Sequence, residues 1–494
     1  MINRLIQYRS SFELGNYLYK IASYGSMLLA ILSLFLISGI EFILLSFSFN
    51  LLLAYLYTLK SVRKIPGMIL LLLNNFIYIQ IPILYMFSKG VEYNFQGFIS
   101  TPNDDSFYYE SMFTGSLFFI FCFLVLIFGL LVGNSVKFKK SLDVDQFKSP
   151  NTLYTWITIA FITFYFIFLD NSANVLARTE EISKGVNVFA FFFSDKTFQT
   201  IFPVLFFLIP IKSKKKSLTW FFFVLLLFFA LNMQGASKAS ILLIFTAFFL
   251  TPIAIFYNEN KNEVIWPCKQ LFMFGIAISI PLFIFASLAR ELSGTGVTFS
   301  WELFSNLYSL VGEVDLGVIS DLIFLRLSAI FNNFILIFSH YTKEVDFSYR
   351  LHFASYSWSS FLNLVLPGTP FPEAYVPTSQ LFPKVLEQNV MESHLDNITL
   401  RQQANTQPYS FFGFLMIVFG GTLTMFLSFF SGMLFSLIYR LSSKVYFKAV
   451  LVFAFSVIFN SYAFEAGLQF IIITFLTSAL MVFLLNFFDS FKFR

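Results

Sequence analysis

The residues best suited to chemistry gather in one stretch of the chain, 290–408. It carries acids, histidines and arginines in an otherwise apolar protein: Arg290, Glu291, Glu313, Asp315, Asp321, Arg326, His340, Arg350, His352 and Arg401. The planar fork of arginine suits phosphate, because it donates paired, charge-assisted hydrogen bonds. Trp301 and Trp358 add aromatic planes of the kind that sugars bind. Phosphate binding beside sugar binding is therefore the chemistry expected here.

Each candidate cation also has a structural interpretation. Lys238, in the short turn QGASKAS, is either a phosphate ligand or a lysine that extends to the membrane surface. Arg290 ends an apolar run, where a cation is favoured by the helix dipole. Arg326 lies five residues after Asp321 and could form a structural ion pair with it. Ionisable groups at membrane depth are costly, so a functional role is weighed for all three, with Arg350 and Arg401 behind them.

A catalytic site would also need a group that can act as a general base. The candidates are His340, His352, Glu313 and Glu291, and the sequence does not choose among them. The histidines could equally be structural residues at the membrane interface, and the acids could lie in solvated turns. The three histidines do not cluster and no CxxC occurs, so no metal site is expected.

The composition places these residues in a membrane protein. Of 494 residues, 57% are hydrophobic and only 12% are charged, and the mean hydropathy is +0.75. A soluble domain carries about a quarter charged residues. The formal net charge of +5 comes with no interleaving of basic and aromatic residues, so nucleic-acid binding is not expected.

The hydropathy pattern predicts an all-α polytopic bundle of about twelve membrane helices, each needing about 20 apolar residues. The candidate runs are 21–39, 41–59, 65–87, 113–134, 152–170, 197–211, 218–233, 239–257, 268–289, 409–438, 446–463 and 466–487. They divide the chain into about nine N-terminal helices (1–289), a large loop (290–408) and about three C-terminal helices (409–494).

Basic residues predict the orientation of this bundle. With a cytoplasmic N-terminus, most lysines and arginines fall in inside loops and most acids fall outside. Both termini are then cytoplasmic and 290–408 is extracytoplasmic. Within that loop, the segment FLRLSAIFNNFILIFSHY (324–341) has apolar residues at helical spacing. We expect a helix on the membrane surface or within the bundle, with Arg326, Asn333 and His340 on or near its polar side.

Four short stretches together with this topology resemble the O-antigen polymerase (Wzy) family of oligosaccharide repeat-unit polymerases. They are QGASKAS (Gln234–Ser240), Arg326 in its apolar helix, LVLPGTPFP (Leu364–Pro372) and ANTQPYSFFGFLMIVFGG (Ala404–Gly421). The first is similar to a Gly-Ser-Arg-like turn, with a lysine in place of the usual arginine. The last is similar to the polar stretch that opens the next span and has spaced glycines.

The resemblance implies a GT-C-like fold and a metal-independent glycosyltransferase of the bacterial inner membrane. Such enzymes transfer a growing glycan from undecaprenyl diphosphate to a newly flipped lipid-linked repeat unit, making O-antigen or capsule-like polysaccharide. The resemblance implies no cofactor, and it implies a chain-length regulator as a protein partner. The cations above would stabilise the departing diphosphate.

Three other functions fit parts of the pattern. A lipid-linked oligosaccharide flippase should show two similar halves and charges within its spans, whereas here the charge concentrates in one loop. An O-antigen ligase has related topology and arginine-rich outer loops. A non-enzymatic membrane scaffold would not need the long, varied polar loop.

Overall fold

The computed structural model describes residues 11–89, 105–136, 250–258, part of 324–338, 347–365, 370–371, 410–443 and 445–459. These residues are almost entirely helical and contain no strand. The helices are α1 (Ser11–Leu36), α2 (Ile40–Leu56), α3 (Lys60–Arg63), α4 (Met68–Asn75), the π-helical turn η2 (Phe76–Gln80), α5 (Ile81–Lys89), α6 (Asp105–Ser135), α13 (Thr251–Asn258), α17 (Phe347–Val365), α20 (Ser410–Leu441) and α21 (Val445–Phe459). The predicted all-α class is thus confirmed for the described part of the chain.

Four of these helical stretches are long and apolar enough to cross a membrane: Glu13–Leu36, Met68–Ser88, Ser111–Ser135 and Ser410–Leu441. Ile40–Leu56 is a shorter apolar helix. The predicted runs 152–170, 197–211, 218–233, 268–289 and 466–487 lie outside the described residues, as does most of 239–257. The described helices support a membrane protein.

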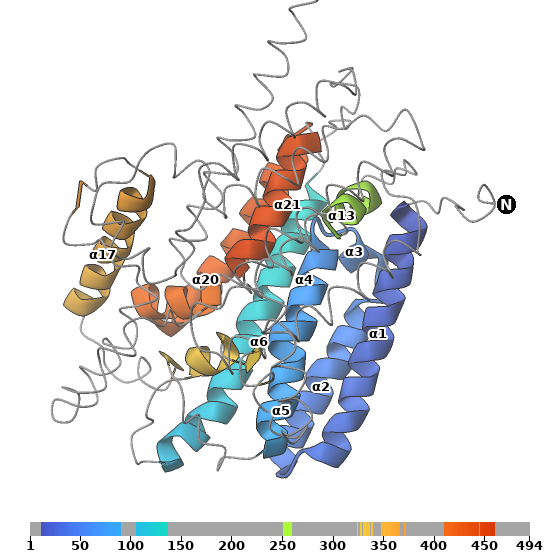
Figure 1. Ribbon diagram of the computed structural model, residues 1–494, viewed down its shortest axis with the longest axis vertical. Helices are drawn as coiled ribbons and strands as arrows, with labels where there is room; N and C mark the ends of the chain where they lie inside the picture. Colours follow the sequence, from blue (N-terminus) through green and yellow to red (C-terminus); the bar gives the residue numbers. More distant parts are fainter. Residues whose placement is uncertain are drawn as a thin grey trace, which may run out of the picture.

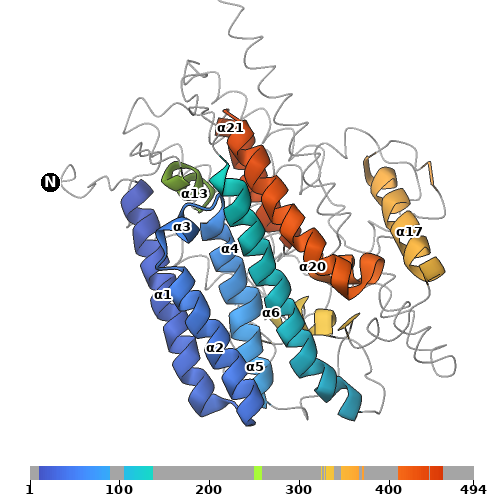
Figure 2. The ribbon, with the colours of Figure 1, turned by 180° about the vertical axis from the view of Figure 1, so that it is seen from behind.

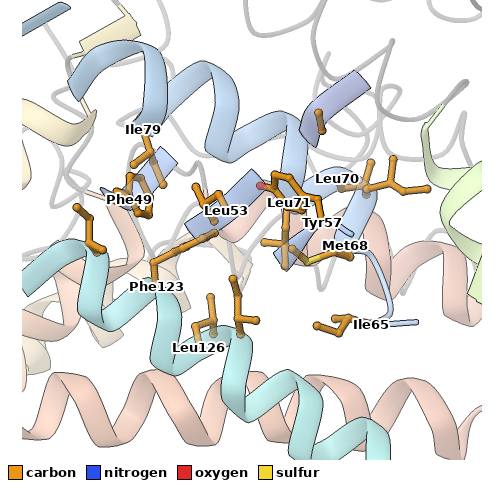
Figure 3. Close-up of a cluster of buried hydrophobic side chains, with 14 of the residues drawn as sticks. Phe49, Leu53, Tyr57, Ile65, Met68, Leu70, Leu71, Ile79, Phe123 and Leu126 are labelled. Carbon is orange, nitrogen blue, oxygen red and sulfur yellow. The ribbon is translucent and has the colours of Figure 1, made fainter. Parts of the chain in front are cut away.

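The long helices stand side by side (Figure 1). In Figure 1 the chain descends through α1 from the end marked N and returns upward through α2. It then descends again through α4, η2 and α5, which form one interrupted helix. A buried apolar core joins α2, α4 and α6, and it includes Leu53, Leu71, Phe123 and Leu126 (Figure 3). Side chains on the outer faces of the same helices are exposed, among them Phe35, Phe128 and Phe426. Exposed apolar faces around a packed core are what a lipid environment requires.

Helices α6 and α20 lie closest together, because both carry small residues at four-residue spacing. A Cβ added at Gly129 would overlap the Phe429 carbonyl, and one at Gly432 would overlap the Leu126 carbonyl. Ser436 Oγ donates to the Leu130 carbonyl at 2.9 Å. Along the two helices Phe119 lies against Phe412, Leu130 against Ser436 and Asn134 against Arg440, so residue numbers rise together and α6 and α20 are parallel (Figure 2). Small residues at this spacing let membrane helices pack backbone to backbone.

Basic residues collect at one end of the bundle. The Arg63 guanidinium donates to the Tyr57 carbonyl at 2.8 Å and lies 5.7 Å from the Tyr19 ring centre. Arg440 donates to the main-chain carbonyl of Asn134, and Asn134 donates in turn to the Lys64 carbonyl at 3.1 Å. The segments between α2 and α4 and at the ends of α6 and α20 therefore meet at the same end. The distribution of basic residues in the sequence predicted that all three of these segments lie on the same side of the membrane.

Candidate functional site

The candidate site forms where α20 is broken. Gly420 has φ 77° and ψ 177°, so it lies outside the helical region although helix continues on both sides. This conformation is open only to glycine in practice. The break leaves the last carbonyls of the first half-helix, and the first N–H groups of the second, without partners inside the helix. In a bilayer such groups must find partners elsewhere in the protein.

Arg350 of α17 supplies the missing partner for the first half-helix. Its Nη1 donates to the Met416 carbonyl at 2.8 Å and to the Ile417 carbonyl at 3.1 Å. A Cβ built on Gly420 would lie 3.4 Å from the same nitrogen, so the cation lies directly against the break. A positive charge is favoured at the negative end of a helix dipole. These two bonds fix the position of the guanidinium group at the break.

The amino-acid pattern of α17 explains how Arg350 reaches the break. Phe353, Ser357 and Phe361 are buried, while Leu351 and Trp358 are more than half exposed. The buried positions follow Arg350 at helical spacing, so all four lie along one face. Phe353 packs on Phe414 of α20, with ring centres 6.3 Å apart. Helix α17 lies at the edge of the described bundle, beside the first half of α20 (Figures 1 and 2).

Aromatic side chains pack α20 against α6 and the 324–338 segment, whose described residues are helical. The Phe119 ring meets the rings of Phe331, Phe334 and Phe412 edge to face, at centre distances of 5.3, 4.8 and 5.2 Å. Gly115 of α6 allows this segment to pack closely, because a Cβ added there would lie only 3.0 Å from Ile335 Cδ1. The first half of α20 is thereby fixed from two sides, by this aromatic cluster and by α17.

Burial of the 324–338 segment corrects one expectation. Asn333 was expected on or near a polar side, yet it is as fully buried as Asn332, at 1% and 2% exposure. Phe324 stacks on Tyr85 of α5 at 4.9 Å, and Phe334 and Phe338 lie against α6. Neighbouring helices cover the segment on several sides. Its buried surface is therefore wider than the single face that the apolar periodicity predicts. The helix was expected either on the membrane surface or within the bundle, and the structure places it within the bundle.

The structure places two of the nine predicted site residues, both on α17. Arg350 reaches the break in α20, and His352 follows on the same helix, two residues later. The others lie outside the described residues: Lys238, Arg290, Glu291, Glu313, Arg326, His340 and Arg401. In the described part of the chain, no three His, Cys, Asp or Glu side chains come together as a metal site would need.

Two features of the site were not anticipated from the sequence. One is the break at Gly420, for which the adjacent pair Gly420–Gly421 was an available signal, since such pairs are common at helix kinks. The other is the role of Arg350 in capping a helix that begins 60 residues later in the chain. No local pattern encodes that pairing, because it depends on how α17 packs.

Comparison of the chain with models of known protein families, with curated protein sequences and with solved structures gives no match.

Proposed function

We propose that this protein is a membrane-embedded glycosyltransferase that polymerises lipid-diphosphate-linked oligosaccharide repeat units. The observation that carries the proposal is Arg350, a cation held against a broken apolar helix by main-chain carbonyls. The resemblance of the sequence to oligosaccharide repeat-unit polymerases supports the same reaction class. The substrate would be an undecaprenyl-diphosphate-linked oligosaccharide, and the product an O-antigen or capsule-like polysaccharide.

The proposed reaction needs positive charge at the membrane surface. A sugar hydroxyl of the incoming repeat unit attacks the anomeric carbon of the growing chain, and the bond from that carbon to the diphosphate oxygen breaks. The diphosphate leaves with the bonding electrons, and a base accepts the hydroxyl proton. A preorganised cation stabilises the charge that develops on the leaving group. Arg350 is suited to this role because its Nη1 is already fixed by two hydrogen bonds.

The remaining predicted residues complete this proposal. Lys238, Arg290, Arg326 and Arg401 would join Arg350 around the diphosphate, and the general base would be His340, His352, Glu313 or Glu291. No metal or cofactor is invoked. Exposed phenylalanines on the bundle surface would let two polyprenyl chains approach from the bilayer.

We propose the orientation from the position of the basic end. Arg440 lies about 20 residues, or roughly 30 Å of helix, beyond Gly420. If the basic end faces the cytoplasm, the broken helix lies toward the outer side of the inner membrane, where lipid-linked repeat units arrive after flipping. Both termini would be cytoplasmic, and a chain-length regulator would be the protein partner.

The proposal is tested by the surface polysaccharide of a strain that lacks the gene. We expect the ladder of long chains to disappear while a band of core plus one repeat remains. Loss of every repeat-bearing band would instead indicate a flippase or a ligase, and an unchanged ladder would exclude all three functions.

Complementation then tests the site. Arg350→Ala should fail to restore long chains at normal protein levels, and Arg350→Lys should restore them only in part. Lys20→Gln is the matched control, because Lys20 is an exposed cation on α1, away from the break. If Arg350→Ala restored long chains fully, Arg350 would have no role in the reaction.

A further inference from the structure

The short helix α3 (Lys60–Arg63) is fixed to the basic end of the bundle by side chains from three other helices. The main-chain carbonyls of residues 63–65 each accept a hydrogen bond from a different helix. The donors are the Tyr19 hydroxyl of α1 at 3.2 Å, the Asn134 amide of α6 at 3.1 Å and the Asn258 amide of α13 at 3.0 Å. Both views show α3 beside α13 at this end (Figures 1 and 2). The backbone of α3 is therefore held in one position.

This fixed backbone carries three cations within one helical turn. The Lys64 N–H donates to the Lys60 carbonyl at 3.3 Å, so the two lysines lie on one face. Both are exposed, and Arg63 beside them is half-buried. Like charges one turn apart repel each other. The segment therefore concentrates positive charge on a backbone that its neighbours hold in place.

No ion pair within the described part of the chain offsets this charge. The guanidinium of Arg63 donates to the Tyr57 carbonyl at 2.8 Å and to Asn16 Oδ1 at 3.4 Å, and neither oxygen belongs to an acid. Glu13, at the start of α1, is the only acid that the structure describes at this end, and it forms no ion pair with the cations of α3. The charge is thus open to an anion from outside the chain.

An exposed apolar surface lies on the membrane side of these cations. Helix α2 ends at Leu56, four residues before Lys60. Its last turns expose Leu51, Leu52 and Tyr55, and tyrosine is typical of the boundary between membrane and water. Going from the basic end into the bundle, the surface changes from lysine to tyrosine to leucine. A phospholipid has the same order, from phosphate to acyl chain.

We propose that α3 and the end of α2 bind an anionic phospholipid, with Lys60 and Lys64 at its phosphate and its acyl chains along the exposed face of α2. Basic clusters at the ends of membrane helices bind anionic headgroups. Arg63 adds charge and acts as a positioning residue, because its bond to the Tyr57 carbonyl links α3 to the end of α2. The site is separate from the break in α20 and does not depend on the proposed reaction.

A diffuse attraction between a basic protein and an anionic membrane is the alternative. It depends on total charge, so every exposed cation would contribute to it in the same way. A built site depends on position, so Lys60 and Lys64 would contribute far more than a cation elsewhere. Variants that each remove one charge therefore separate the two.

The test is the unfolding midpoint of the purified full chain in detergent, measured as phosphatidylglycerol or phosphatidylcholine with the same acyl chains is added. A ligand that binds the folded state raises the midpoint with its concentration. We expect a saturable rise with phosphatidylglycerol and little or none with phosphatidylcholine, which has no net charge. Equal rises with both lipids would overturn the proposal. A rise of the same size with inorganic phosphate would overturn the assignment to a lipid.

Single-charge variants then locate the site. Lys60→Gln and Lys64→Gln should each raise the half-saturating concentration of phosphatidylglycerol about fivefold, the contribution of one basic residue near an anionic headgroup. Lys89→Gln is the matched control, because Lys89 ends α5 at the opposite end of the bundle (Figure 1), and it should leave that concentration unchanged. Equal shifts in Lys64→Gln and Lys89→Gln would overturn the proposal in favour of diffuse attraction. The half-saturating concentration is read independently of the starting midpoint, so a destabilised variant still decides the question.

Discussion

Two helix interfaces in this bundle hold their helices together in opposite ways. Where α6 meets α20, glycine and serine bring the backbones into direct contact. Where α1 meets α2 and η2, larger amides and hydroxyls bridge the gap through hydrogen bonds. The first interface depends on the absence of side-chain volume, and the second depends on the presence of matched polar atoms. They should therefore fail under different substitutions.

The difference has a physical origin in the solvent. Lipid provides no hydrophobic driving force between helices, so association depends on close packing and on interhelical hydrogen bonds. The α6–α20 contact uses packing, which allows α20 to be interrupted at Gly420 without losing its hold on α6. The α1–α2 contact uses polar pairing, in which buried hydroxyls and amides bond to one another.

The largest effect should come from adding volume to the packed interface. Gly129→Ala would drive a methyl group into the Phe429 carbonyl, and backbone atoms cannot rotate away. Overpacking of this kind costs about 1–3 kcal/mol or more. We expect a strong loss of folded protein and a lower unfolding midpoint in detergent.

Gly421→Ala provides the control for that change. Its added Cβ would meet Phe118 and Met416 side chains at 3.7–3.8 Å, an ordinary contact distance. Its stability should stay close to that of the wild type. If Gly129→Ala and Gly421→Ala behave alike, then the backbone contact is not what holds α6 to α20.

A somewhat smaller loss is expected from closing the break in α20. Gly420→Ala would force a methyl-bearing residue to adopt φ 77°, a strain of about 1–3 kcal/mol. It would also crowd Arg350 Nη1. We expect lower stability together with a shortened polysaccharide ladder. A ladder of normal length at normal protein levels would mean that the break is dispensable for activity.

The sequence predicted the helices better than it predicted their irregularities. The runs 113–134 and 446–463 correspond to α6 and α21, because about 20 apolar residues leave few alternatives to a membrane helix. The run 65–87 was expected to be one helix, and Pro82 was the unused signal that its interior is a π turn. Helix α1 already includes Ser11, ten residues before the predicted apolar run 21–39, so the helix continues through the charged Lys20.

Site residues were harder to predict than helices. Arg350 was proposed for its charge alone, and nothing near it in the sequence indicated the Met416 and Ile417 carbonyls as its partners. The sequence does not distinguish Asn75 and Gln80 from other amides within apolar runs, which usually bond to neighbouring helices. Only the packed structure shows which of their atoms are unpaired.

A moderate effect on stability is expected from Arg350 itself. Arg350→Gln keeps a donor but loses charge and reach, and it leaves at least one of the Met416 and Ile417 carbonyls without its bond. The expected cost is about 1–3 kcal/mol, measured as the shift in unfolding midpoint. A stable Arg350→Gln protein that makes no long chains would separate the role of the charge in catalysis from its role in capping.

The smallest effect should come from the polar interface when a pair of atoms is removed together. Ser33→Ala alone leaves Ser46 Oγ without its 2.7 Å partner, although Asn50 still donates to it at 3.3 Å. The double variant with Ser46→Ala removes both hydroxyls, so the cycle isolates their mutual bond. Hydrogen bonds between membrane helices average about 0.6 kcal/mol, and we expect a coupling of that size. A coupling near zero would mean that the Ser33–Ser46 bond does not help to hold α1 to α2, which would weaken the contrast between the two interfaces.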